Sequence, residues 1–247
     1  MLSHVARLYR QSLKPADSLF NLYLARPIAA VLVAVLARTS VTPNQVTFAS
    51  LFIMVAAVAA LAFVPGPLGL LLGILGIELS YVFDCADGQL ARLTGQTSPV
   101  GALLDFLMDE LKALLLVVAI TLRLALLEGG GTDALCIGLV VVLVVGCALA
   151  LTKFIRTPEY ASATGTVPLK HGEASGAASK SKSPLWPVMA IVRLISQYPT
   201  TLPLFALFNR LDLFLYAYGL VHLLYVGQIM LVLMWKLGRR TKGSEAA

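Results

Sequence analysis

The sequence predicts an all-α membrane protein: a polytopic bundle of six transmembrane helices, with one further helix lying at the membrane surface. Hydrophobic residues make up 58% of the 247 residues and charged residues only 13%, whereas soluble domains carry about 25% charged residues. The mean hydropathy is +0.85. Apolar stretches of about 20 residues, the length that crosses a bilayer, recur across residues 44–236. Residues 1–247 are therefore expected to form one membrane domain without a large soluble module.

The N-terminal segment, residues 1–43, is expected to lie in the cytoplasm ahead of the first span. Residues 1–17 show neither the apolar core nor the small-residue cleavage site of a signal peptide. Residues 19–38 are apolar, but Arg26 and Pro27 interrupt them, so the continuous run is too short to cross a membrane. We therefore expect an amphipathic helix at the cytoplasmic membrane interface.

The six predicted spans are separated by residues that break helices. They are expected at about residues 45–64, 67–90, 100–124, 134–156, 185–208 and 212–236. The run Pro65-Gly66-Pro67 separates the first two spans, and Gly129-Gly130-Gly131 separates the third from the fourth. Arg193 and three prolines interrupt the fifth span, which leaves a broken fifth helix, or five spans in all, as alternatives.

Basic residues gather on one side of the predicted spans, which sets the expected orientation. That side has Arg7, Arg10, Lys14, Arg26 and Arg38 before the first span, then Arg92, then Lys153, Arg156, Lys170, Lys180 and Lys182, and finally Lys236, Arg239, Arg240 and Lys242. Only Arg123 and Arg210 flank the spans on the other side.

Both termini, the loop 157–184 and the tail 237–247 are therefore expected in the cytoplasm, and in a prokaryote the membrane would be the cell membrane. The loop contains a Ser-, Gly- and Lys-rich run typical of flexible linkers. The net charge of +6 suits an anionic membrane leaflet and gives no reason to expect a nucleic-acid partner.

Four aspartates lie near the facing ends of the second and third predicted spans. Asp84 and Asp87 are one helical turn apart, as are Asp105 and Asp109, so each pair occupies one face of its helix. The connection LTGQTSP is short enough to make the two helices antiparallel neighbours. Both pairs are expected to face each other at the cytoplasmic boundary of the membrane.

This arrangement favours a site for divalent cations and a diphosphate. Carboxylates buried together are costly unless cations neutralise them, and oxygen ligands without His or Cys suit hard ions such as Mg²⁺, Mn²⁺ or Ca²⁺. Gly88, Ala91 and Gly101 leave room on the same faces, and Arg92 offers a guanidinium to phosphate oxygens. A single carboxylate would be as consistent with helix packing or an ion path, but four in this arrangement favour a chemical site.

The pattern D-x2-D-G-x2-A-R-x8-G-x3-D-x3-D resembles the signature of the CDP-alcohol phosphotransferases, which are integral membrane enzymes. All eight fixed positions match: Asp84, Asp87, Gly88, Ala91, Arg92, Gly101, Asp105 and Asp109. The segment TPNQVT, Thr42 to Thr47, is similar to the family segment that opens the first span.

The resemblance implies a reaction, a metal dependence and a role for each of these residues. In this family a CDP-linked alcohol donates its phosphoalcohol group to a second alcohol, and CMP leaves. Asp84, Asp87 and Asp105 would hold two Mg²⁺ or Mn²⁺ ions, while Asp109 would assist in metal binding and act as general base. The nucleotide pocket would consist of Gly88, Ala91, Arg92, Gly101, Asn44 and Thr47. The family also implies a homodimer.

Several charged residues of the predicted spans are not part of the signature. Lys112 lies on the face of Asp105 and Asp109, and we expect it to neutralise Asp109 or Glu78, with substrate selection as the alternative. Lys153, Arg156 and Arg193 could form a second basic pocket for a phosphorylated acceptor, such as inositol phosphate or glycerol phosphate. The alternative is that Lys153 and Arg156 are ordinary flanks of a cytoplasmic helix end.

The sequence therefore predicts a transferase of phospholipid biosynthesis, with CDP-diacylglycerol as the expected donor. A soluble CDP-alcohol with a lipid or polyol acceptor is the alternative within the family. Two other classes are alternatives outside it: an intramembrane prenyltransferase, which would show two acidic motifs far apart, and a divalent-cation transporter. Release of CMP distinguishes the transferase from both.

Overall fold

Every regular element in the described part of the chain is helical. The computed structural model describes residues 20–165, 195 and 197–238. The elements are η1 (Asn21–Ala25, a π-helix), α2 (Arg26–Leu36), α3 (Pro43–Phe63), α4 (Gly66–Thr94), α5 (Pro99–Leu126), α6 (Gly131–Phe154), α7 (Pro158–Thr164), α9 (Tyr198–Leu207) and α10 (Leu211–Leu237). The prediction of an all-α helical bundle is confirmed.

Four of the described helices, α3, α4, α6 and α10, are long and apolar enough to cross a membrane. They correspond to the first, second, fourth and sixth predicted spans. Helix α5 has 28 residues, which gives a length of about 42 Å at 1.5 Å per residue, more than a bilayer core requires. It is not among the four because it carries five charged residues: Asp105, Asp109, Glu110, Lys112 and Arg123.

The fifth predicted span lies partly outside the described residues, as do residues 1–19 and most of the predicted loop and tail. Its described part contains α9, whose 10 residues are about 15 Å long and too short to cross a bilayer alone. Arg193 of the predicted basic pocket is also outside the described residues. Within the predicted loop 157–184 the structure describes the short helix α7.

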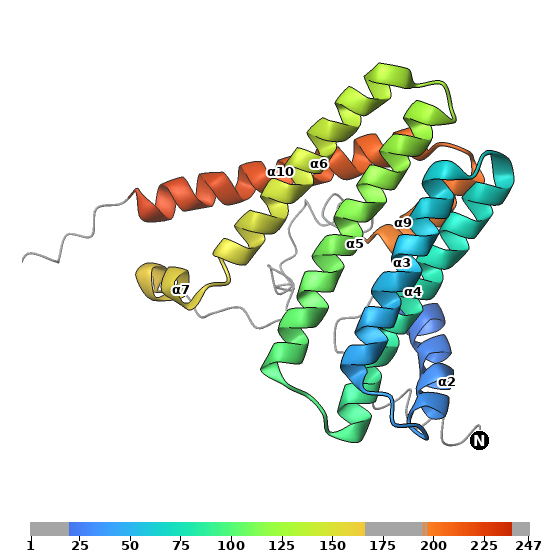
Figure 1. Ribbon diagram of the computed structural model, residues 1–247. Coiled ribbons are helices and arrows are strands. Elements are labelled where there is room, and N and C mark those ends of the chain that lie inside the picture. Colours follow the sequence, from blue (N-terminus) through green and yellow to red (C-terminus); the bar gives the residue numbers. More distant parts are fainter. Residues whose placement is uncertain (1–19, 166–194, 196, 239–247) are drawn as a thin grey trace, which may run out of the picture.

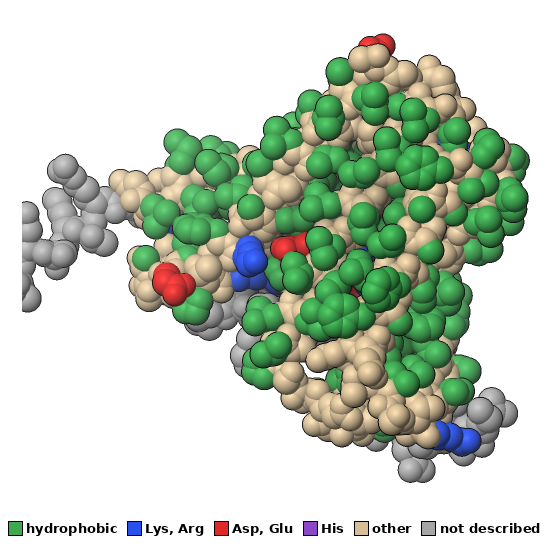
Figure 2. All heavy atoms as spheres, in the orientation of Figure 1, with side chains coloured by type: hydrophobic (Ala, Val, Ile, Leu, Met, Phe, Trp, Pro, Cys, Tyr) green, Lys and Arg blue, Asp and Glu red, His purple; other side chains and the backbone are tan. Residues whose placement is uncertain are grey.

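The core is built from α3, α4, α5, α6, α9 and α10, whose apolar side chains meet in one cluster. Ile77, Leu116 and Phe214, from three of these helices, are fully buried at its centre. Helix α3 packs against both α4 and α5, and α6 packs against both α5 and α10 (Figure 1). Apolar side chains also cover most of the outer face in Figure 2, with charged side chains in a few small groups, as expected of a surface that faces lipid.

Small residues allow α3 and α4 to approach closely. A Cβ atom added to Gly73 would lie 2.6 Å from the Cβ of Leu61, and one on Gly76 would lie 2.6 Å from the Cβ of Ala57. Further along, Ser50 and Ser80 donate hydrogen bonds to each other's carbonyl oxygens, at 3.0 and 2.8 Å. Close backbone approach and interhelical hydrogen bonds are the main attractions between helices in lipid, so this contact fixes how α4 presents its aspartates.

The apolar N-terminal helix expected within residues 19–38 is present as η1 and α2. Ala29, Ala30 and Val33 are fully buried, and α2 packs against α4. Ile28, Val31 and Val35 on the other face are about half exposed. The helix is therefore apolar on both faces, one covered by protein and the other exposed.

Helix α3 begins and α4 ends at residues well suited to those positions. Thr42 and Gln45 form a capping box, in which the Thr42 N–H donates to Gln45 Oε1 at 2.9 Å and the Gln45 N–H to Thr42 Oγ1 at 3.4 Å. Helix α4 ends at Gly95, whose φ of +68° is left-handed and favours glycine. Both ends lie at the same end of the bundle as the start of α5 (Figure 1).

Candidate active site and metal centre

Three carboxylates converge between the second half of α4 and the first half of α5. One oxygen each of Asp84, Asp105 and Asp109 lies within 4.8 Å of the others. The side chain of Asp84 is 13% exposed and that of Asp109 is 54% exposed, so the group is closed on the Asp84 side and open on the Asp109 side. Three convergent carboxylate oxygens without His or Cys are the donor set of a hard divalent cation such as Mg²⁺ or Mn²⁺. This group could therefore hold a metal ion.

Asp87, the fourth signature aspartate, is directed to α3 instead. Its side chain is buried, and the hydroxyl of Thr47 donates a hydrogen bond to its Oδ2 at 2.5 Å. The structure therefore groups three of the four predicted metal ligands and places Asp87 outside that group. A carboxylate has a second oxygen, so this bond leaves the predicted metal role of Asp87 untested. It does show that Thr47, predicted in the nucleotide pocket, contacts a signature aspartate.

The other predicted nucleotide-binding residues come from the starts of α3 and α5 and the end of α4. A Cβ atom on Gly88 would lie 3.4 Å from Nη1 of Arg92, so the Arg92 guanidinium extends across Gly88. A Cβ atom on Gly101 would lie 3.1 Å from Ser98 Oγ and 3.5 Å from Asn44 Oδ1, which places Asn44 beside α5. Ser98 also accepts a hydrogen bond from the Gly101 N–H at 3.0 Å and so caps α5.

Ala91 lies in the last turn of α4, where its carbonyl accepts hydrogen bonds from the N–H groups of Gly95 and Gln96. Its methyl side chain, like the hydrogen of Gly88, leaves space beside Arg92. The segments predicted to form the nucleotide pocket therefore meet at one end of the bundle, although the pocket itself stays a prediction.

Lys112 and Glu78, which lie outside the signature, differ in their surroundings. The Lys112 ammonium forms an ion pair with Asp84 and lies 3.9 Å from Asp109. The expected pairing of Lys112 with Asp109 is confirmed, whereas Glu78 is not its partner and sequence reasoning missed Asp84. Among the described residues Glu78 forms no ion pair, and its buried Oε1 has no hydrogen-bond partner there.

The predicted basic pocket is described in part. Lys153 lies in the last turn of α6, and Arg156 follows that helix. The Arg156 guanidinium carbon lies 5.1 Å from the centre of the Phe106 ring, within the range of a cation–π contact. Phe106 follows Asp105 directly, so Arg156 lies against the helix that carries two signature aspartates. Sequence reasoning missed Phe106, although an aromatic residue adjoining a signature aspartate was an available signal.

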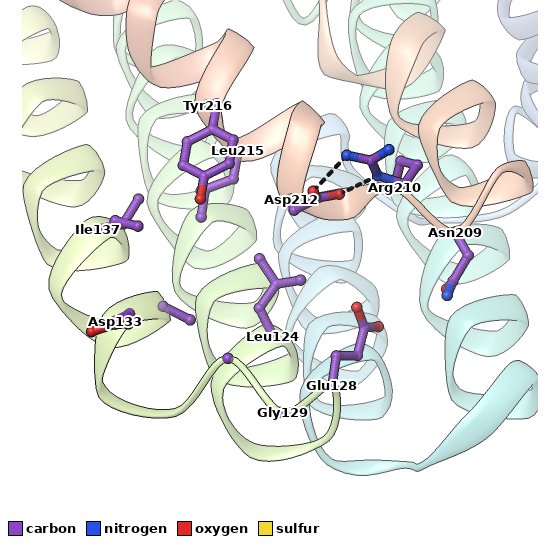
Figure 3. Close-up of a pocket in the computed structure, with 12 residues that line it drawn as sticks. Leu124, Glu128, Gly129, Asp133, Ile137, Asn209, Arg210, Asp212, Leu215 and Tyr216 are labelled. Atoms are coloured by element: carbon purple, nitrogen blue, oxygen red, sulfur yellow. Dashed lines mark hydrogen bonds and ion pairs between the residues drawn. The ribbon is translucent and has the colours of Figure 1, made fainter.

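A cavity of about 490 Å³ lies far from these residues, at the other end of α5, and Figure 3 shows its lining. Glu128, one of the lining residues, is 19 positions beyond Asp109, which corresponds to about 28 Å along the helix axis. Most charged side chains that line the cavity are paired. Arg210 donates to both oxygens of Asp212 at 2.9 Å, and Glu128 accepts from Arg123 at 2.7 Å. No signature residue lines this cavity, so it is separate from the aspartate site.

Residues 40–235 match the CDP-alcohol phosphatidyltransferase family. The chain therefore belongs to this family of membrane enzymes, which confirms the resemblance inferred from the signature and makes it a multi-pass integral membrane protein.

Two relatives illustrate the relationship. The chain is 38% identical over 95 residues to the archaetidylinositol phosphate synthase of Aeropyrum pernix, and the match covers 38% of this chain and 46% of that protein. The chain thus spans about half the length of this curated relative. It also resembles the crystal structure of Mycobacterium tuberculosis phosphatidylinositol phosphate synthase with CDP-DAG bound, at 17% identity and a TM-score of 0.47, over 85% of this chain and 92% of that chain.

Proposed function

We propose that the protein transfers a phosphoalcohol group from a CDP-alcohol to an acceptor alcohol and releases CMP. The observation that carries this proposal is the convergence of Asp84, Asp105 and Asp109 from the two helices that bear the family signature. Bound Mg²⁺ or Mn²⁺, as two ions, would neutralise the diphosphate and stabilise the departing CMP phosphate. The residues that would hold these ions are Asp84, Asp87, Asp105 and Asp109.

The protein's own residues supply positioning and proton transfer. The acceptor oxygen forms a bond to the phosphorus that carries the donated alcohol, and the bond from that phosphorus to the CMP phosphate breaks. Asp109, whose side chain is about half exposed and so within reach of an entering acceptor, takes the hydroxyl proton. Arg92 and Asn44, with the space left by Gly88 and Gly101, would hold the nucleotide.

We further propose CDP-diacylglycerol as donor and a phosphorylated polyol, such as inositol phosphate or glycerol phosphate, as acceptor. Arg156 supports this choice, because it lies against Phe106, next to Asp105, where an acceptor phosphate would be close to the carboxylates. The archaetidylinositol phosphate synthase relative also supports it, since an inositol phosphate product is part of that protein's name. The alternative is a soluble CDP-alcohol donor with a lipid or polyol acceptor.

The proposed arrangement in the membrane has six spans, with α5 and the region of α9 as the third and fifth. Helix α2 would lie at the interface with its exposed apolar face toward lipid. The aspartate site and both termini would face the cytoplasm, where a water-soluble nucleotide can meet a lipid chain. A homodimer is part of this proposal. The family match argues against a prenyltransferase or a cation transporter.

The acceptor is identified by measuring CMP release from CDP-diacylglycerol by purified protein in detergent with Mg²⁺ or Mn²⁺. The panel is inositol phosphate, inositol, glycerol phosphate and serine. We expect CMP with a phosphorylated polyol and none with inositol or serine. If no acceptor of the panel yields CMP from CDP-diacylglycerol, while CDP-inositol or CDP-choline yields CMP with a lipid acceptor, the donor and acceptor assignments are reversed.

A further inference from the structure

Lys112 is the largest fully buried side chain in the described part of the chain, with a relative exposure of 1%. It lies in α5 one turn after Asp109. Its ammonium pairs with Asp84 of α4 and lies 3.9 Å from Asp109 of α5. The side chain therefore bridges the two helices that supply the aspartates.

The energetics of burial explain why this ammonium and these carboxylates are found together. A buried ammonium without a partner would cost several kcal/mol, and so would a buried carboxylate such as Asp84. Asp84 has only 13% of its side chain exposed, so water cannot compensate its charge fully. One lysine therefore offsets one negative charge on the closed side of the carboxylate group.

The closed side of the carboxylate group holds the Lys112 ammonium, and the open side is where a metal ion could bind. Asp109, which is 54% exposed, marks the side from which a metal ion and a diphosphate could enter. Lys112 is fully buried against Asp84 and is attached to the chain, so it remains in place whether or not a metal ion is bound. A fixed positive charge beside Asp84 and Asp109 also repels an incoming divalent cation.

We propose that Lys112 is a positioning residue: a fixed internal cation that holds Asp84 and Asp109 together without metal and weakens metal binding enough to keep it reversible. The inference rests on the metal site of the proposed function and adds a residue that the family signature does not contain. Its consequence is that loss of the ammonium makes the protein more dependent on bound metal for its stability.

The test is Mn²⁺ binding and thermal unfolding of the purified protein in detergent at pH 8, without nucleotide. Lys112→Met removes the charge but keeps the chain length, and Lys112→Arg keeps a cation. We expect Lys112→Met to unfold at a lower temperature in EDTA and to bind Mn²⁺ at least tenfold more tightly, measured by electron paramagnetic resonance of free Mn²⁺. Lys112→Arg and Lys236→Met, a lysine in the last turn of α10, should bind Mn²⁺ as the unchanged protein does.

Unchanged or weaker Mn²⁺ binding by folded Lys112→Met would overturn the proposal. If that variant does not fold, the double variant Asp84→Asn with Lys112→Met decides, because it removes both partners of the ion pair. We expect the double variant to regain most of the lost unfolding temperature in EDTA. A double variant as unstable as the single one would also contradict the proposal. CMP release by the unchanged protein, which tests the proposed function, is independent of these outcomes.

Discussion

At the residue scale, the hydrogen bond from Thr47 to Asp87 joins α3 to the signature of α4. The bond is buried, 2.5 Å long and made to a carboxylate. Since a hydrogen bond to a charged group contributes about 1.5–3 kcal/mol, Thr47→Val should lower the free energy of unfolding by roughly that amount. Chemical or thermal unfolding in detergent measures the change.

The matched control for Thr47 is Thr121→Val in α5. Thr121 is also buried, but its hydroxyl bonds only to the Val117 carbonyl of its own helix, at 2.8 Å. Thr121→Val should therefore lower the free energy of unfolding clearly less than Thr47→Val does. An equal loss of unfolding free energy in the two variants would show that the Thr47–Asp87 bond contributes no more than a hydrogen bond within one helix.

Arg123 is a second residue whose contacts predict a clear loss of stability when it is replaced. It is 3% exposed and donates to the carbonyl oxygens of Leu61 and Gly66 at 3.0 and 3.1 Å, and to Glu128 at 2.7 Å. It therefore ties the α3–α4 turn to the end of α5. Arg123→Met should destabilise the protein by about 1–3 kcal/mol, because it leaves the carbonyl oxygens of Leu61 and Gly66 without their donor and removes the ion pair with Glu128.

Arg210 provides the comparison for Arg123 in the same unfolding measurement. Its side chain is about half exposed and pairs with Asp212 at the surface, where ion pairs contribute little. We expect Arg210→Met to change the unfolding temperature only slightly. Similar losses in the two arginine variants would contradict the structural role of Arg123.

At the scale of elements, we predict opposite changes in stability for a glycine-to-alanine change inside the contact between α3 and α4 and for one outside it. Gly76→Ala places a methyl group 2.6 Å from the Cβ of Ala57, and such overpacking costs about 1–3 kcal/mol. Gly146→Ala in α6 meets no atom within 4 Å and should gain up to about 1 kcal/mol from its higher helix propensity. Unfolding temperatures that move in the same direction would disprove the close approach at Gly76.

The contact between α5 and the end of α6 leads to a prediction about the acceptor. Phe106→Leu removes the aromatic ring over which Arg156 lies, and cation–π contacts are worth about 0.5–2 kcal/mol. If the acceptor carries a phosphate bound by Arg156, its KM should rise about 2- to 30-fold while the KM of the CDP-linked donor stays unchanged. Phe52→Leu, on the exposed face of α3, is the control. Equal changes in both KM values would argue against an acceptor role for Arg156.

The elements also show what could be predicted from the sequence. Asp105 and Asp109 share a face because helical periodicity is local, and the short α4–α5 connection brings Asp84 to them. The bond between Thr47 and Asp87 and the pairing of Lys112 with Asp84 could not be predicted. They depend on how α3, α4 and α5 are rotated against one another, which side-chain packing decides.

At the scale of the whole molecule, the apolar pattern located the long helices and predicted a span at residues 100–124, but α5 is not among the four helices apolar enough to cross a membrane. That helix is long enough to span but carries charges that an apolar span normally lacks. Four of its five charged residues are Asp105 and Asp109 of the carboxylate group, Lys112, and Arg123. Polar residues within membrane segments are commonly functional, so the residues of the site account for the weaker apolar signal of α5.

The whole molecule can be understood as a lipid-facing bundle that carries one polar site at one end. The α3–α4 contact and Arg123 stabilise the bundle, and the capped helix ends hold Asn44, Gly101 and the aspartates together. The cavity at the other end has its own paired charges. The central claim is therefore that only the aspartate end performs the metal-dependent transfer.

The most direct test is CMP release from CDP-diacylglycerol and a phosphorylated polyol by Asp84→Asn, Asp105→Asn and Asp109→Asn, with and without Mg²⁺ or Mn²⁺. Asp133→Asn, which alters the cavity at the other end, is the control. We predict that each of the three variants loses at least about 100-fold in rate, that the control keeps its rate, and that EDTA abolishes CMP release. CMP release that survives EDTA, or that persists in all three variants, would contradict the account.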